Sequence, residues 1–313
     1  MGNESNSNDV LFFENSYEER IWDLVVVYEG INVPRFIKVK NGGLLFICGE
    51  PPMSRKYSNR FLKLFDSIII PDSSINHRAR IITHQALPWH YGFNHKTETF
   101  SCEFDELKRM PPPLKYKNIS MISSAKTMMP GHKNRKLFMA HLMKKFDDKI
   151  DFYGLGHNWV EDKRSALDNY MFSICVENSN IPDYWTEKIS DAYLAYTVPI
   201  YFGCTNIDKY FDPKSYIYID ITDVEVASKT ISSILENPQI IYESYFDALC
   251  VSREKVLSEY NLFGLIKKLL KTNIVLLDTY QALTLIPSNS FFDHHVKNNL
   301  LRIKRGFYKI LSK

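Results

Sequence analysis

Short apolar runs alternate along this chain with more polar stretches. In the first third, runs rich in β-branched and aromatic residues at 24–28, 44–48 and 67–70 predict strands that are covered on both faces. Between the last two, residues 58–65 have the spacing of an amphipathic helix, which completes a β-α-β unit. This part of the sequence therefore predicts an α/β domain.

The same alternation is clearer in the second half of the chain. Helices of ordinary length between strands are typical of a mostly parallel, doubly wound sheet, which binds ligands beyond the carboxyl ends of its strands. Two α/β domains facing each other would enclose a central cleft. The strands are predicted at 150–153, 172–176, 198–202 and 216–219, and the helices at 134–146, 162–170, 185–196 and 224–235.

A domain boundary is predicted in the middle of the chain. Residues 97–118 are charged, contain three successive prolines and show no periodicity, which is typical of a linker or long loop. We therefore expect an N-terminal domain of residues 1–110, with a polar, disordered start, and a ligand-binding domain of residues 119–288. A C-terminal helix of residues 289–313 would follow.

The last segment is strongly basic. After Asp293 it contains no acidic residue, and lysines and arginines alternate with apolar side chains. Such a basic amphipathic helix can lie in an anionic membrane interface, so residues 290–313 are a candidate for peripheral membrane contact. A helix that packs its apolar stripe on the body of the protein is an equal alternative.

Composition narrows the class of protein. With 313 residues and 45% hydrophobic side chains, the chain can build large cores. We expect a soluble or peripheral protein, because no apolar stretch reaches the ~18 residues of a membrane span and the first nine residues lack a signal-peptide core. A net charge of +3 is too small to predict nucleic acid as a partner. Five scattered cysteines without a C-x-x-C pair indicate reduced thiols in a cytoplasm.

One candidate site lies at the start of the helix predicted at 185–196. Asp183 or Thr186 can cap this helix, which places Glu187 and Lys188 in its first turn. Free N–H groups and the helix dipole attract anions there, so a diphosphate could bind with Lys188 as a second positive contact. Glu187 could then accept hydrogen bonds from sugar hydroxyls. The alternative is an exposed Glu-Lys pair without a ligand.

Residues near this helix strengthen the site. Residues 177–179 and 203–206 follow two of the predicted strands, at the edge where α/β sheets bind ligands. Arg135 is predicted to open the helix at 134–146 and suits bidentate phosphate contact. For the neighbouring Lys133 and Lys136, a solvated helix face is the better interpretation.

A second candidate site lies in the N-terminal domain. Glu50 follows the strand predicted at 44–48, where its carboxylate could act as a general base, although it could equally cap a turn. Asp66 and Asp72 are poorer alternatives. The three histidines at 84, 90 and 95 lie close together in sequence, and we expect packing or acceptor-loop roles for them. No D-x-D triplet is available to hold a metal-bound diphosphate, so no metal is expected.

Four motifs together point to a family. FSICVENS (172–179), DYWTEKISDA (183–192), VPIYFG (198–203) and FDPKSYI (211–217) closely resemble the α-1,3-fucosyltransferases of glycosyltransferase family 10, especially the bacterial members. The resemblance implies a GT-B architecture of two Rossmann-like domains, with GDP-fucose held by the C-terminal domain and the acceptor by the N-terminal one. It implies that Arg135, Asn178, Tyr184, Glu187 and Lys188 bind the donor, and a Gly-Glu pair in the family supports Glu50 as the base.

The predicted function is an inverting, metal-independent fucosyltransferase without a cofactor. It would move fucose to a glycan hydroxyl in bacterial surface polysaccharide or lipopolysaccharide synthesis, in the cytoplasm or on the inner face of the cytoplasmic membrane. A different nucleotide-sugar donor and a non-catalytic nucleotide-sugar-binding protein are the alternatives. A dinucleotide-dependent oxidoreductase is disfavoured, because the sequences at 49–51 and 154–156 both lack the third glycine of that fingerprint.

Overall fold

The computed structural model describes residues 10–14, 18–123, 130–154 and 158–288, and the side chains of 130–132 are also outside the description. The chain forms two compact units. Unit 1 consists of residues 1–81 and 269–313, and unit 2 of residues 82–268. A parallel sheet in each unit confirms the predicted α/β class. The C-terminal helix predicted at 289–313 lies outside the described residues.

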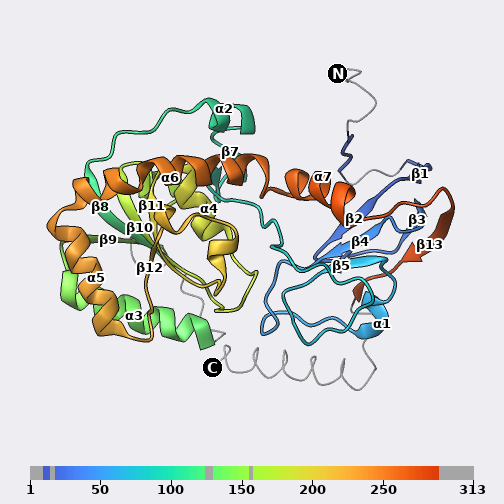
Figure 1. Ribbon diagram of the computed structural model, residues 1–313, viewed down its shortest axis with the longest axis horizontal. Coiled ribbons are helices and arrows are strands. Elements are labelled where there is room, and N and C mark those ends of the chain that lie inside the picture. The colour runs from blue at the N-terminus through green and yellow to red at the C-terminus, as the bar shows by residue number, and fades with distance from the viewer. Residues whose placement is uncertain (1–9, 15–17, 124–129, 155–157, 289–313) are drawn as a thin grey trace. The chain divides into compact units, whose positions relative to one another are not determined.

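Unit 1 contains two three-stranded sheets (Figure 1). The parallel sheet has the order β2-β4-β5 and confirms the three strands predicted in this part of the chain. Its helix is shorter than predicted: α1 covers only Asn59–Leu62, with the Ser58 side chain accepting from the N–H of Phe61. The strands of the first sheet are β2 (Val25–Tyr28), β4 (Leu44–Ile47) and β5 (Ser67–Ile69); those of the second are β1 (Ile21–Trp22), β3 (Arg35–Lys40) and β13 (Tyr280–Leu285).

The second sheet explains why unit 1 takes residues from both ends of the chain. Strand β13 pairs antiparallel with β3, from Tyr280 opposite Lys40 to Leu285 opposite Arg35. Leu285 is buried in the core of unit 1. Residues 269–288, which we predicted in the second domain, therefore belong to unit 1, because this pairing satisfies their backbone hydrogen bonds there.

Unit 2 is built on a five-stranded parallel sheet with the order β12-β11-β10-β8-β9. Helices α4 and α6 cover one face, and α3 and α5 cover the other (Figure 1). The strand order reverses between β8 and β10, and such a switch point is where doubly wound sheets bind ligands. The strands are β8 (Lys117–Ile122), β9 (Ile150–Tyr153), β10 (Tyr170–Val176), β11 (Val198–Phe202) and β12 (Ile217–Tyr218); the helices are α3 (Pro130–Phe146), α4 (Glu187–Leu194), α5 (Val224–Glu236), α6 (Pro238–Ser258) and α7 (Leu262–Thr272), the last of which contains the unit boundary.

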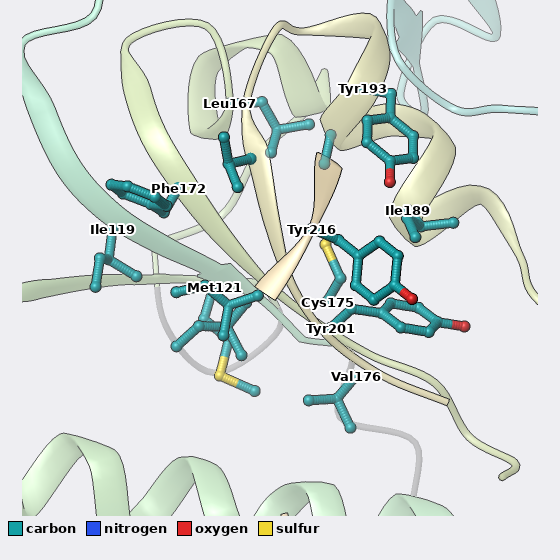
Figure 2. Packing of buried hydrophobic residues seen from close by; sticks show 14 of the residues in the cluster. Ile119, Met121, Leu167, Phe172, Cys175, Val176, Ile189, Tyr193, Tyr201 and Tyr216 are labelled. Atoms are coloured by element: carbon teal, nitrogen blue, oxygen red, sulfur yellow. The ribbon is translucent and has the colours of Figure 1, made fainter. Parts of the chain in front are cut away.

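The centre of unit 2 is strand β10, in which all seven residues are buried. It pairs with β8 on one side and β11 on the other. Figure 2 shows Ile189 and Tyr193 of α4 beside the rings of Tyr201 and Tyr216. The hydroxyl of Tyr193 is 2.8 Å from that of Ser215, so this buried phenol is hydrogen-bonded.

The linker predicted at 97–118 is wrong. This stretch contains β7 (Thr99–Phe100), which pairs with β6 (Phe93–Asn94), then α2 (Phe104–Arg109) and the start of β8. Residues 82–110, predicted in the first domain, belong to unit 2. The physical reason is a set of buried polar contacts: Asp191 accepts from the N–H groups of His90 and Tyr91, and Asp162 accepts from that of Gly92.

Another predicted helix is also shorter. The stretch 162–170 contains only a 3-10 turn, η1 (Lys163–Ala166), which Asp162 caps, and Tyr170 already belongs to β10. Two further 3-10 turns are η2 (Ile207–Lys209) and η3 (Pro213–Ser215). Among the described residues, no helix is both long and apolar enough to cross a membrane.

The packing of β10 gives a stability prediction. Phe172 has no exposed surface, so Phe172→Ala should lower the free energy of unfolding of unit 2 by about 3–5 kcal/mol, through lost burial and the cavity left behind. Phe100→Ala is the matched control, because the Phe100 side chain is 60% exposed and its loss should cost less than about 1 kcal/mol. Urea denaturation followed by circular dichroism measures both. Equal losses would contradict the assignment of Phe172 to the core.

Candidate functional site

A buried carboxylate lies at the carboxyl end of β10. The side chain of Glu177 has no exposed surface. Its Oε1 accepts from the backbone N–H of Thr186 at 2.8 Å, and its Oε2 accepts from the Thr186 hydroxyl at 2.7 Å. The ammonium of Lys188 lies 3.2 Å from Oε2. A carboxylate without water needs such partners, so Glu177 ties the end of β10 to the start of α4.

Gly203 makes room for this carboxylate. A Cβ atom at this position, directly after β11, would lie 2.7 Å from both Glu177 Cβ and the Tyr201 hydroxyl. Real side-chain carbons do not approach so closely. The glycine of the motif VPIYFG is therefore needed for space.

Helix α4 begins two residues later than predicted, with Thr186 as its N-cap. The predicted core face is confirmed: Ile189, Ala192, Tyr193 and Tyr196 are all buried. The Glu177 carboxylate lies beside this helix end and accepts from Thr186, whose hydroxyl in turn accepts from the N–H of Lys188. The diphosphate predicted at the first turn of α4 stays a prediction.

Lys188 has three oxygen neighbours from the protein. Its Nζ is 2.9 Å from the Thr186 hydroxyl, 3.1 Å from Glu187 Oε1 and 3.2 Å from Glu177 Oε2. Burial lowers the pKa of this ammonium, but the two carboxylates more than offset burial and raise the pKa above its ordinary value. Lys188 is therefore charged, and its 22% exposed side chain still reaches solvent.

Glu187 accepts from Lys188 and also faces Lys163, whose Nζ is 3.7 Å from Glu187 Oε1. Burial raises the pKa of Glu187, but the charges of Lys188, Lys163 and His90 lower it well below its ordinary range. The carboxylate is therefore ionised and can accept hydrogen bonds from ligand hydroxyls.

Arg135 is buried in α3, in the second turn rather than at the helix start where we predicted it. Burial lowers the pKa of its guanidinium, while the charges of Glu177 and Glu187 oppose that effect. The structure thus brings Arg135 within electrostatic reach of the Glu187–Lys188 pair. Lys133 and Lys136 are exposed on α3, as predicted.

Asn178 and Tyr184 differ in what they offer a ligand. The side-chain oxygen of Asn178, directly after Glu177, is buried and has no hydrogen-bond partner among the described residues. A buried acceptor without a partner is costly, and such groups are explained by a ligand or water at functional sites. The side chain of Tyr184 is buried, which agrees with a packing role in the core, and its predicted role in donor binding stays a prediction.

The turn before α4 is fixed by Asp183, which adopts a positive φ of 58°. Its Oδ1 accepts from the hydroxyl of Tyr210 at 2.6 Å, the ammonium of Lys209 at 2.7 Å and the amide of Asn206 at 3.2 Å. These contacts hold a backbone conformation that is unfavourable for a non-glycine residue. Asp183 therefore shapes the turn, and Thr186 is the cap.

Glu50 lies in unit 1, in the loop after β4, and its side chain is exposed. No hydrogen bond to its carboxylate occurs among the described residues, so it does not cap a turn there. Glu29, which sequence reasoning did not single out, lies after β2 and accepts from Gly49 N–H and from Arg55 at 2.8 Å. Asp66 and Asp72 accept from nearby backbone N–H groups, which explains both by structural roles.

Of the three histidines, His84 has a packing role. Its ring stacks on Trp185 at 5.1 Å, and burial, with Lys268 and Lys209, lowers its pKa to about 3. Burial and the charge of Lys163 also lower the pKa of His90. Within the described ranges, no group of three or more His, Cys, Asp or Glu residues could hold a metal ion.

Sequence reasoning missed Lys163 and Asp191 as members of this cluster, placed Glu177 beside the site without a role, and expected a packing or acceptor-loop role for His90. Lys163 and Asp191 are 28 residues apart, so no local pattern connects them. The one available signal was Asp191 itself, an acid one turn after Glu187 on the face of α4 that otherwise packs in the core.

Comparisons with known proteins bear on this part of the chain. Residues 113–255, which lie wholly within unit 2, match the model of the glycosyltransferase family 10 (fucosyltransferase) C-terminal region. The matched segment, somewhat less than half of the 313-residue chain, is thus similar to the C-terminal region of glycosyltransferase family 10.

Curated relatives match parts of the chain. The chain is 45% identical over 65 residues to the α-(1,3)-fucosyltransferase FucT of Helicobacter pylori, which is 21% of this chain and 13% of that protein. It is 34% identical over 132 residues to a putative fucosyltransferase-like protein of Arabidopsis thaliana, which is 40% of this chain and 26% of that protein. The matches thus span only a small part of the relatives' lengths.

A solved structure of an α1,3-fucosyltransferase with GDP-fucose is also similar, with 21% sequence identity. The match covers 77% of this chain and 82% of that chain, with a TM-score of 0.44.

The close approach of Gly203 to Glu177 predicts a sensitive position in this site. Gly203→Ala should displace the Glu177 carboxylate from Thr186 and Lys188, and lower the free energy of unfolding by about 1–3 kcal/mol. Thr205→Ala, two residues further on and exposed, is the matched control and should have little effect. Thermal unfolding measures both variants, and an unchanged midpoint for Gly203→Ala would refute the close contact.

Proposed function

We propose that the chain transfers fucose from GDP-fucose to a glycan hydroxyl, with the donor bound in unit 2. The observation that carries the proposal is the convergence of Arg135, Glu187 and Lys188 beyond the carboxyl ends of β10 and β11, in a segment that is similar to family 10. The relatives' names support fucose as the donor sugar. The order of the sheet supports the place, since the switch point next to β10 is the usual ligand position.

Each donor-binding residue has a distinct task in this proposal. Arg135 and Lys188 stabilise the negative charge of the departing GDP. Since Lys188 is already in contact with Glu177 and Glu187, it exchanges or shares these partners when a phosphate binds. Glu187 and the unpartnered oxygen of Asn178 accept hydrogen bonds from hydroxyl groups of the nucleotide sugar.

The chemistry of transfer supplies the remaining roles. Inverting transfer needs a base that takes the proton of the acceptor hydroxyl as its oxygen attacks the anomeric carbon. We assign this role to Glu50, whose exposed carboxylate has no polar partner among the described residues.

The proposal includes metal independence, a bacterial surface polysaccharide or lipopolysaccharide as the acceptor, and a cytoplasmic location, which the five free cysteines support. It also includes peripheral membrane contact through residues 290–313.

Nucleotide selectivity is the first test. Wild-type protein should show a thermal shift with GDP that exceeds those with UDP, CDP and NAD, because a ligand that binds only the folded state stabilises it. Lys188→Ala should weaken GDP binding about 10- to 100-fold, through the loss of one charge-assisted contact. Lys229→Ala is the control, since Lys229 is exposed on α5. A shift with NAD and none with GDP would refute the proposal.

Transfer itself is the second test. In an assay with GDP-fucose and galactose- or N-acetylglucosamine-containing acceptors, Glu50→Gln should lower kcat at least about 100-fold and leave the affinity for GDP unchanged. The matched control is Asp72→Asn, whose carboxylate accepts only from neighbouring Ser74. The assay contains excess EDTA. Full activity of Glu50→Gln would remove this residue from the mechanism, and a strict requirement for a divalent ion would contradict metal independence.

A further inference from the structure

Lys163 is a buried cation between two acidic residues of α4. It is the first residue of η1, and its side chain is only 14% exposed. Its Nζ donates to Asp191 Oδ2 at 2.6 Å and lies 3.7 Å from Glu187 Oε1. An ammonium in such surroundings is retained only where its charge is compensated. One cation therefore serves two carboxylates that are one helical turn apart.

The two carboxylates have different surroundings. Asp191 is buried, and its Oδ1 also accepts from the N–H groups of His90 at 2.7 Å and Tyr91 at 2.9 Å. It thus fastens the segment before β6 to α4. Glu187 is 20% exposed and accepts only from Lys188 among the hydrogen bonds of the described residues. Of the two, only Glu187 is open to a ligand.

We propose that Lys163 is a positioning residue, which uses its bond to Asp191 as an anchor and holds the Glu187 carboxylate for the hydroxyl groups of a nucleotide sugar. The inference rests on the proposed function, because it names the residue that prepares Glu187 for that donor. Lys163 itself contacts no ligand. Its role differs from that of Lys188, whose ammonium is divided between Glu187 and the buried Glu177.

The surroundings of Glu187 explain why a second cation is needed. Lys188 cannot serve Glu187 alone, because it also compensates the charge of Glu177, whose side chain has no exposed surface. Burial raises the pKa of Glu187, and Lys188 and Lys163 are the two largest opposing influences. Without Lys163 the pKa of Glu187 should rise toward its ordinary range. The charged or titratable groups facing Glu187 are Lys188 and Asp191 on α4, Lys163 in η1, His90 in the segment before β6, Arg135 in α3 and, through Lys188, Glu177 after β10.

The direction of the pH effect follows from this. When Glu187 is protonated, it loses its negative charge and can no longer accept two hydrogen bonds as a carboxylate. The affinity for GDP-fucose therefore falls as the pH falls through the pKa of Glu187. In Lys163→Met that loss should occur at higher pH than in the wild type. In Lys163→Met we expect the Kd for GDP-fucose to be about twofold weaker at the pH that equals the Glu187 pKa and about tenfold weaker one pH unit below it, and to approach the wild-type value at pH 8. Lys163→Arg should restore most of the affinity.

The test combines calorimetric titration of GDP-fucose from pH 5 to 8 with ¹³C-glutamate NMR of Glu187 in the free protein. Lys96→Met is the matched control, because its ion pair with Glu161 at 3.1 Å is exposed. Asp191→Asn removes the anchor of Lys163, so it should move the acid limb of binding in the same direction as Lys163→Met. A general loss of structure would instead weaken binding at every pH and would not shift the acid limb.

A further variant separates the effect of Glu187 on the pH profile from that of His90, because Lys163 also influences the pKa of His90. In a Glu187→Gln background, Lys163→Met should no longer shift the pH profile. An unchanged Glu187 titration in Lys163→Met, with wild-type binding of GDP-fucose intact, would overturn the inference. If the wild type binds no GDP-fucose and the NMR shift is still present, the proposed function fails while the electrostatic role of Lys163 stands.

Discussion

The site in unit 2 depends on one carboxylate that has no contact with water. Glu177 is bound by the backbone and hydroxyl of Thr186 and by the ammonium of Lys188. Removing a partner from a buried charge costs several kcal/mol, because the remaining charge stays desolvated and unpaired. This requirement fixes the start of α4 against the end of β10, and it explains why the residue after β11 is Gly203.

The need to compensate each buried charge also applies to the residues around Glu177. Lys188 compensates Glu177 and Glu187, and Lys163 compensates Glu187 and Asp191. Acids and bases thus alternate along the cluster, so that each buried charge has an opposite neighbour. Such an arrangement is rigid, because moving one side chain disturbs the compensation of the next. A ligand that enters this cluster meets charged groups that are already oriented, which lowers the cost of ordering them on binding.

The sequence predicted the elements that are apolar and locally regular. The strands at 150–153, 172–176 and 198–202 were found within two residues. Every residue of the last two is buried, and buried residues alternate with half-buried ones in the first. It did not predict β13 or the end of the first domain, since the pairing of β13 with β3 joins residues about 245 positions apart in the chain. Among the site residues, Glu187 and Lys188 were found from a contiguous motif. Lys163 and Asp191 were missed because only the folded chain brings them together. The position of the Glu177 carboxylate at the start of α4 was also missed, because such a helix end suits a bound phosphate equally well.

The pairing of β13 with β3 also has a consequence for biosynthesis. Unit 1 is interrupted by the whole of unit 2, and its second sheet is complete only when residue 285 is available. During vectorial synthesis, unit 2 emerges as a continuous segment and can form its five-stranded sheet first, while one edge of β3 still lacks its partner. An open strand edge can pair with other chains, so the nascent protein carries an aggregation-prone edge for as long as it takes to translate the roughly 245 residues from the end of β3 to the end of β13.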